Sequence, residues 1–255
     1  MKIAVMQPYF FPYIGYFQVI HAVDTYILHG ALNYRKKGWV NRNRILGPKG
    51  SPIYVNAEIR DSSSHRTINN VELVDADRWR KKFLLGVFHN YRKSPHFDEA
   101  YGLIEKAVSG QTAYLSALNK QCIRSICACL GILTRIESNE EKYSSLEERL
   151  ADADGDVRSE FPGLRLSQYD RKVIRILEIC RQENADVFVN AIGGRALYDK
   201  AEFSNNGVNL CFVETQPFTY PQRAPAFVPD LSIIDVLMNC GKEGTRELLA
   251  KYRLV

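Results

Sequence analysis

The sequence has no apolar run long enough to cross a membrane. A spanning helix needs about 20 consecutive apolar residues, and no stretch of the 255-residue chain reaches that length. The beginning of the chain also lacks the apolar region and small-residue cleavage site of a secretory signal peptide. We therefore expect a cytoplasmic protein without a membrane span.

Patterns for metal binding are scarce as well. The six cysteines do not form the CxxC spacing of a zinc site, and Cys127 and Cys129 stand two positions apart on an expected helix, where they cannot share a face. We expect reduced, mostly buried cysteines, although a nucleophilic role stays open for Cys211 and Cys240. The acidic run at 152–156 fits a calcium loop only in part. We expect no metal site, and the sequence leaves the cofactor unknown.

Strong charge of one sign is missing too. A formal net charge of +5 is modest, and no nucleic-acid-binding signature accompanies it, so we expect no nucleic-acid partner. Basic residues cluster at 35–44, 78–82 and 92–93, where they could attract phosphates or simply form a solvated face. We favour a small phosphorylated substrate over nucleic acid. With 45% hydrophobic residues, the chain can bury a large core, and we expect residues 1–255 to form a single domain.

What the sequence does have is an aromatic, proline-rich beginning. The apolar run 3–6 is typical of a buried strand, and two prolines force a turn before a helix that begins near Tyr13. Because α/β domains bind ligands at the carboxyl ends of their strands, this turn is a candidate substrate site. The expected contacts are Gln7, Tyr9, Phe10 and Tyr13. The alternative is that the aromatic rings fill the top of a core.

A second strand at 24–28 would make a parallel pair with the first. His29 follows it directly and is the candidate catalytic base, with a structural histidine as the alternative. A hairpin is expected over 39–59, where Arg42 and Arg44 share one strand face and suit a diphosphate. Asn41 and Asn43, on the other face, could bind sugar hydroxyls or hold the loop. The alternative for the hairpin is an edge strand guarded by charge.

The rest of the chain predicts a fold class. Helices are expected at 78–93, 97–108 and 112–130, as a helical bundle inserted at about 76–131, and an acidic surface segment at 140–163. Strands are expected at 133–137, 186–190 and 208–214, and a short helix at 231–238 is followed by a terminal helix. The fold class is therefore α/β, with a mainly parallel sheet flanked by helices, a β-hairpin and the inserted bundle.

A second candidate ligand turn follows the strand at 186–190. Gly193 and Gly194 let the backbone approach an anion, and Arg195 supplies charge at the start of the next helix. The alternative is an ordinary tight turn. We expect this corner, the first turn and the hairpin arginines to converge on one phosphate-sized hollow. The aromatic loop at 219–229 could close over it.

The opening MQPYFFPYIGYFQ, followed by WVNRNRI at 39–45, resembles the WbqC-like family of bacterial proteins. The similarity continues through the segments 79–82, 90–93 and 232–235. The family is associated with gene clusters for O-antigen and other lipopolysaccharide or surface polysaccharides, so the resemblance implies work on sugars. Family members usually carry an acidic residue near position 29, where this chain has His29.

From the resemblance we expect an enzyme of surface-glycan biosynthesis, a transferase that acylates the amino group of a nucleotide-linked amino-deoxy sugar. Two alternatives stay open. One is an ATP-dependent ligase or nucleotidyltransferase-like enzyme of the same pathway, although the HxGH motif of nucleotidyltransferases is missing. The other is a non-catalytic protein that binds a nucleotide sugar.

Overall fold

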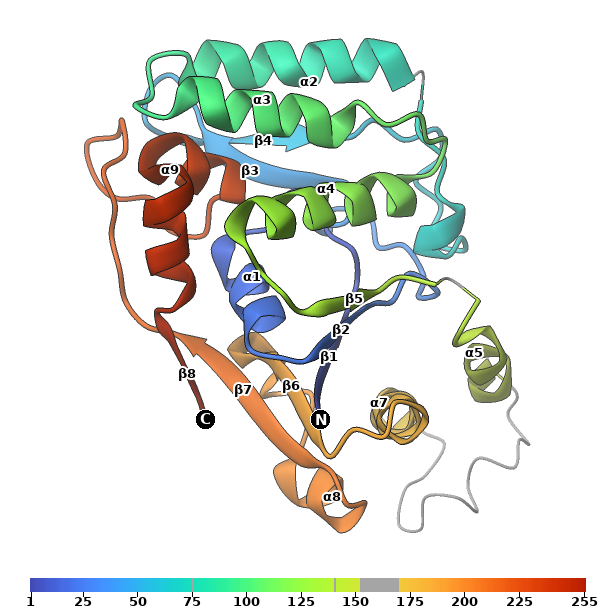
Figure 1. Ribbon diagram of the computed structural model, residues 1–255. Coiled ribbons are helices and arrows are strands. Elements are labelled where there is room, and N and C mark those ends of the chain that lie inside the picture. The colour runs from blue at the N-terminus through green and yellow to red at the C-terminus, as the bar shows by residue number, and fades with distance from the viewer. Residues whose placement is uncertain (75, 140, 152–169) are drawn as a thin grey trace.

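The chain forms a three-layer α/β structure around one six-stranded sheet (Figure 1). The computed structural model describes residues 1–74, 76–139, 141–151 and 170–255. The sheet order is β5-β2-β1-β6-β7-β8, and all pairs are parallel except β7 with β8. The strands are β1 (Lys2–Met6), β2 (Thr25–Leu28), β5 (Arg135–Glu137), β6 (Val187–Ala191), β7 (Asn209–Thr215) and β8 (Tyr252–Leu254). The predicted fold class, a mainly parallel α/β sheet with a separate hairpin, is confirmed.

The first strand is buried on both faces, as its unbroken apolar run predicts. Ile3 packs into one hydrophobic core and Ala4 into the other, because successive side chains point to opposite faces of a strand. Helix α1 (Ile14–His21) then returns the chain to β2, and Ile3 pairs in register with Thr25. The expected parallel pair is confirmed.

Helices cover both faces of the sheet. On one face lie α1, α4 (Leu115–Leu130) and α9 (Ile233–Leu249), and on the other lie α5 (Ser144–Ala151), α7 (Asp170–Gln182) and α8 (Lys200–Asn205) (Figure 1). The apolar stripe of α7 is buried, as its spacing predicts: its members are Val173, Ile174, Leu177 and Cys180. Burial of two such faces at about 25 cal/mol per Å² of apolar area supplies most of the stabilisation.

A separate antiparallel hairpin sits beyond the sheet. It consists of β3 (Arg42–Leu46) and β4 (Pro52–Asn56), and α2 (Ala76–Tyr91) and α3 (Phe97–Val108) lie over it (Figure 1). The α2 stripe of Trp79, Phe83, Val87 and Tyr91 is buried in the same core as α1. The predicted helical stretch is therefore present between the hairpin and β5. Short 3₁₀ turns, η1 (Ile68–Asn70) and η2 (Ile192–Gly194), complete the described elements.

Three parts of the chain differ from the prediction or lie outside the description. The acidic segment expected as a surface loop contains α5, whose Leu146 and Leu150 are buried. The last two helices are one element with a break at Gly241, where φ is 64°, and strand β8 follows it. The acidic run at 152–156, which fits a calcium loop in part, lies outside the described residues.

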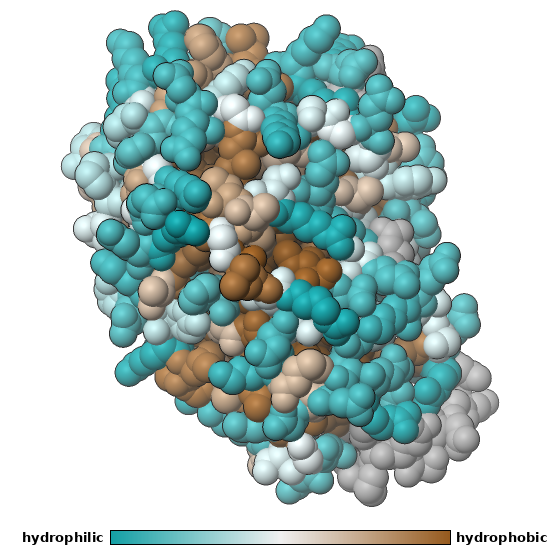
Figure 2. All heavy atoms as spheres, in the orientation of Figure 1, coloured by the Kyte–Doolittle hydropathy of each residue, from teal (hydrophilic) through white to brown (hydrophobic). Residues whose placement is uncertain are grey.

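Hydrophilic residues cover most of the face drawn in Figure 2, and hydrophobic residues gather in a patch near its middle. Within the described residues, no helix has both the length and the apolar character needed to cross a bilayer.

Candidate ligand-binding site

The strand order reverses at β1, which pairs with β2 on one side and with β6 on the other. At such a switch point the connections leave neighbouring strands in opposite directions, and a crevice opens at the carboxyl ends of the strands. A cavity of about 710 Å³ lies there, lined by the end of β1, by His29 after β2, by Asn190 of β6 and by α5 and α7. We call this cavity the switch-point pocket.

The first turn supplies two side chains to the pocket, Gln7 and Tyr9. The hydroxyl of Tyr16 donates a hydrogen bond of 2.8 Å to the Gln7 carbonyl, which fixes the backbone where β1 ends. Burial raises the pKa of the Tyr9 phenol, and nearby Arg35 offsets part of that rise. Tyr9 is therefore a neutral donor and an aromatic surface for a ligand.

Buried polar side chains from distant elements hold the turn itself. The bonds run from Asn119 Nδ2 to the Pro8 carbonyl (2.8 Å), from Asn43 Nδ2 to the Phe11 carbonyl (2.8 Å) and from Ser232 Oγ to the same Phe11 carbonyl (2.7 Å). They satisfy carbonyl groups that would otherwise be buried without partners. They also support Phe11 at a φ of 39°, which is uncommon for a residue with a side chain.

His29 and Glu147 form a hydrogen-bonded pair on the wall of the pocket. His29 is 4% exposed, and its Nε2 lies 2.9 Å from Glu147 Oε1. A carboxylate only accepts, so Nε2 carries the proton and Nδ1 is the nitrogen left to accept one. Arg175 donates two hydrogen bonds to the same carboxylate, one from Nε at 2.5 Å and one from Nη2 at 2.8 Å. Burial alone would raise the pKa of Glu147, but the bonds from His29 and Arg175 bring it down to about 2.

Three further cations line the pocket: Arg35, Arg171 and Lys172. Glu147 is the one carboxylate among the described lining residues, and Arg175 and His29 already occupy it. Nowhere in the described chain do these three cations form an ion pair, and Arg171 Nε is buried without a hydrogen-bond partner. A buried donor without a partner costs about 1–3 kcal/mol. Counted over the described lining residues, the pocket therefore has a surplus of positive charge suited to an anionic ligand.

The turn that contains Gly193 and Gly194, which we call the glycine corner, borders the pocket through Asn190. Asn190 Oδ1 accepts a hydrogen bond of 2.8 Å from the Ala191 N–H. Its Nδ2 lies only 2.5 Å from the position that a Cβ would take if residue 194 had a side chain. Gly194 thus makes room for the Asn190 amide, whereas Gly193 faces open space. The two glycines end a 3₁₀ turn, and Asp199 caps the following helix, which begins only at Lys200.

The hairpin residues do not line the switch-point pocket. Arg42 donates to the Lys37 and Gly38 carbonyls and lies over the Tyr54 ring, 4.4 Å from its centroid. Arg44 donates to the Asp230 carbonyl at 3.3 Å. These contacts use some of the donors that were expected to hold a diphosphate, whereas Arg44 Nε is buried without a hydrogen-bond partner.

The neighbouring asparagines are also engaged. Asn41 accepts from the Tyr34 hydroxyl at 2.9 Å, and Asn43 is buried under the first turn. The expected convergence of three segments is therefore corrected: the pocket is lined by the first turn and by residues flanking the glycine corner, without the hairpin.

The other aromatic residues of the first turn lie elsewhere. Phe10 is fully buried against Trp79 and Phe83, which matches the core alternative for that ring. Tyr13 lines a separate cavity of about 260 Å³ together with Gly15 and aromatic residues of the loop before α9. Arg195 is exposed and does not line the switch-point pocket.

Sequence reasoning missed the cations of α7 and their partner Glu147. A signal was present, because Arg171 and Arg175 are one helical turn apart on the polar side of a strongly amphipathic helix. Glu147 had no such signal, since only the packing of α5 against α7 brings it to His29, which lies 118 residues away in the chain.

The fold and the pocket define an α/β protein with a cavity lined by basic residues, a candidate ligand site, at the switch point of a doubly wound sheet. Residues 7–247 match the WbqC-like protein family, and the chain belongs to that family. It is 29% identical over 245 residues to the uncharacterized protein Rv1507c of Mycobacterium tuberculosis, with 95% of each chain covered. No solved structure matches it.

Proposed function

We propose that this protein is an enzyme of bacterial surface-glycan biosynthesis that acylates the amino group of a nucleotide-linked amino-deoxy sugar in the switch-point pocket. The observation that carries the proposal is the pairing of His29 with Glu147 beside cations that have no carboxylate partner among the residues the structure describes. A base of this kind and a surplus of positive charge are the two things that proton removal from a phosphorylated substrate requires.

The phosphates of the substrate would lie against Arg171, Lys172 and Arg35. Arginine forks bind phosphate oxygens through paired donors. Gln7 and Asn190, which both line the pocket, would offer amide groups to sugar hydroxyls, and Tyr9 would offer a ring for stacking. A volume of about 710 Å³ suits a ligand of nucleotide-sugar size.

In the proposed reaction, the substrate amine attacks the carbonyl carbon of an acyl thioester. A C–N bond forms, the C–S bond breaks and the thiolate leaves. Nδ1 of His29 accepts the proton that the attacking nitrogen releases, while Glu147 holds the imidazole through Nε2 and stabilises its positive charge. Arg175 keeps the Glu147 carboxylate ionised.

The test combines calorimetric binding of nucleotide-linked amino sugars with assays of acyl transfer from acyl-CoA. We expect Arg171→Ala to weaken nucleotide-sugar binding by about tenfold, the effect of one charge-assisted hydrogen bond. Lys81→Ala, an exposed cation on α2 outside the pocket, is the matched control and should bind normally. His29→Gln should retain binding but lose about 100-fold or more of the transfer rate.

Other outcomes would assign the protein differently. Pyrophosphate or phosphate release from ATP in the presence of an amino sugar, without transfer from acyl-CoA, would identify a ligase or nucleotidyltransferase. Binding without any turnover, unaffected by His29→Gln, would identify a non-catalytic nucleotide-sugar-binding protein. Normal binding by Arg171→Ala would refute the role given to the cations.

A further inference from the structure

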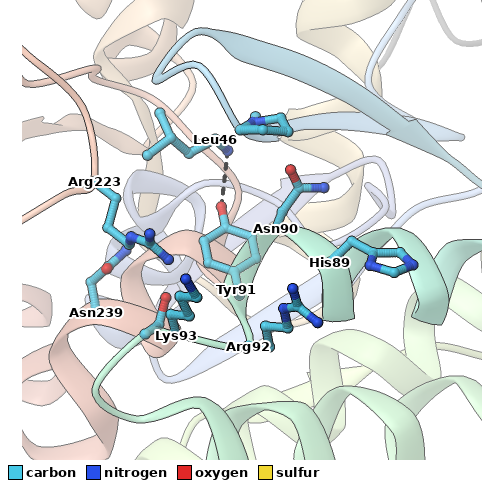
Figure 3. A pocket seen from close by; sticks show the side chains of 11 residues that line it. Leu46, His89, Asn90, Tyr91, Arg92, Lys93, Arg223 and Asn239 are labelled. Carbon is cyan, nitrogen blue, oxygen red and sulfur yellow. Dashed lines mark hydrogen bonds between the residues drawn. The ribbon is translucent and has the colours of Figure 1, made fainter.

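A second cationic cavity lies at the carboxyl end of α2, apart from the switch-point pocket. Its volume is about 210 Å³, and it shares no lining residue with that pocket. We call it the α2 pocket. Figure 3 shows its walls: His89 lies in the last turn of α2, Arg92 and Lys93 follow directly after that helix, and Arg223 comes from the loop between β7 and α9.

The charges of the α2 pocket are not balanced within the described chain. No carboxylate is among its described lining residues, and none of the four basic side chains has an ion-pair partner among the described residues. Arg92 lies over the Phe88 ring at 5.9 Å, a contact that leaves its donors available. The negative end of the α2 dipole can account for cations on the helix itself. It does not account for Arg223, which arrives from another element.

A buried hydroxyl points to the same conclusion independently. Ser94 is 7% exposed and lines the pocket, yet its Oγ has no hydrogen-bond partner. Asn90 also lines it: its Nδ2 donates to the Gly86 carbonyl at 2.7 Å, while its buried Oδ1 has no partner. Unpaired buried polar atoms are rare in folded proteins. A ligand oxygen that accepts from Ser94 and a ligand hydroxyl that donates to Asn90 would satisfy both.

We propose that the α2 pocket is a second anion site, which binds the phosphate group of a small phosphomonoester. A phosphomonoester carries a charge of about −1.5 to −2 at pH 7, which matches a cavity lined by several basic side chains and by no described carboxylate. The two guanidinium groups and the Ser94 hydroxyl would donate to the phosphate oxygens. Because the cavity is smaller than the roughly 300–1,000 Å³ of common drug-sized ligand sites, it suits one phosphate on a short hydroxylated carbon chain.

The test uses the full chain with Arg171→Ala and Lys172→Ala, which removes two cations from the switch-point pocket. Inorganic phosphate and glycerol 3-phosphate are titrated by calorimetry into this background protein. We expect both to bind, and Arg223→Ala, added to the background, to raise each Kd by about tenfold, the effect of a charge-assisted hydrogen bond. Ser94→Ala should raise each Kd severalfold without altering any charge or the loop that carries Arg223. Lys81→Ala, on the exposed side of α2, should change neither.

Absence of binding by either ligand to a folded background protein would overturn the proposal. So would a Kd that neither Arg223→Ala nor Ser94→Ala changes, because the anion would then be bound elsewhere. Glycerol 3-phosphate that binds at least as tightly as inorganic phosphate supports a phosphomonoester. Binding of inorganic phosphate alone would overturn that assignment.

Discussion

The bonds that converge on Glu147 predict a defined pH dependence of stability. With an ordinary pKa of 4.5 and a value of about 2 in the folded protein, its ionised form is favoured by folding. Each pKa unit corresponds to about 1.36 kcal/mol, so the shift contributes about 3 kcal/mol to the free energy of unfolding at neutral pH. The folded-state pKa is lowered, so this contribution is complete above pH 4.5 and is lost as the pH falls toward about 2.

The perturbation is Glu147→Gln, which cannot titrate. Urea unfolding, followed by tryptophan fluorescence between pH 5.5 and 3, gives the free energy of unfolding for both proteins by linear extrapolation. Glu147 is the titratable group that the substitution removes, so its carboxylate dominates the difference. The free energy of unfolding should be higher for the unchanged protein than for Glu147→Gln at pH 5.5. This difference should fall by about 2 kcal/mol from pH 5.5 to pH 3.

The neighbouring residue offers a matched control. Glu148 is exposed and forms no ion pair within the described chain, so Glu148→Gln should shift the free energy of unfolding by less than about 0.5 kcal/mol at every pH. The other carboxylates titrate identically in all three proteins and cancel in the differences. A Glu147→Gln difference that stays constant from pH 5.5 to 3 would refute the reasoning, because it would mean that Glu147 has an ordinary pKa in the folded state.

Two further substitutions test how the first turn and the glycine corner are built. Gly194→Ala displaces the Asn190 amide, since the new Cβ would lie 2.5 Å from Nδ2, and calorimetry should show severalfold weaker nucleotide-sugar binding. Gly193→Ala, which meets open space, should bind normally, and equal effects would contradict the argument. Asn119→Ala removes two bonds to buried carbonyls and should lower the free energy of unfolding by about 2–4 kcal/mol in urea melts. A loss no larger than that of the exposed Asn209→Ala would show that the bonds do not hold the turn.

Helices whose apolar residues recur at a regular helical spacing were predictable from the sequence. The helix at 97–108 has the bounds of α3, and the stripe from Trp79 to Tyr91 is buried as its spacing requires. The helix ended by Gly131 follows from the left-handed conformation that glycine readily adopts, with φ at 67°. In each of these cases the signal is local, and the tertiary structure agrees with it.

The missed features depend on contacts between distant segments. Strand β8 has only three residues and becomes a strand by pairing with β7. The alternation of side chains along a strand correctly places Arg42 and Arg44 on one face of β3. It does not reveal the backbone carbonyls that accept hydrogen bonds from them. The position of His29 at the end of β2 was predictable, whereas Glu147, its partner, arrives through the packing of α5.

The pKa values of two carboxylates, Glu147 and Asp235, shift in opposite directions. Their hydrogen-bond donors explain the difference. Glu147 accepts from a guanidinium and an imidazole, which lower its pKa despite burial. Asp235 accepts only from uncharged donors, the hydroxyls of Tyr91 and Tyr220 and the amide of Gln222, so burial outweighs them and its pKa is raised.

The raised pKa means that the ionised form of Asp235 disfavours folding, and the penalty grows as the pH rises through the folded pKa. What keeps Asp235 in place is its geometry, because one carboxylate ties α2 and the loop before α9 together. Arg92, which follows α2 directly, and Arg223, which lies in that loop, line the α2 pocket. Glu147 instead positions a base beside the cations of the switch-point pocket. Glu147, whose donors include a guanidinium group, therefore has a role in the proposed chemistry. Asp235, whose donors are uncharged, has a structural role.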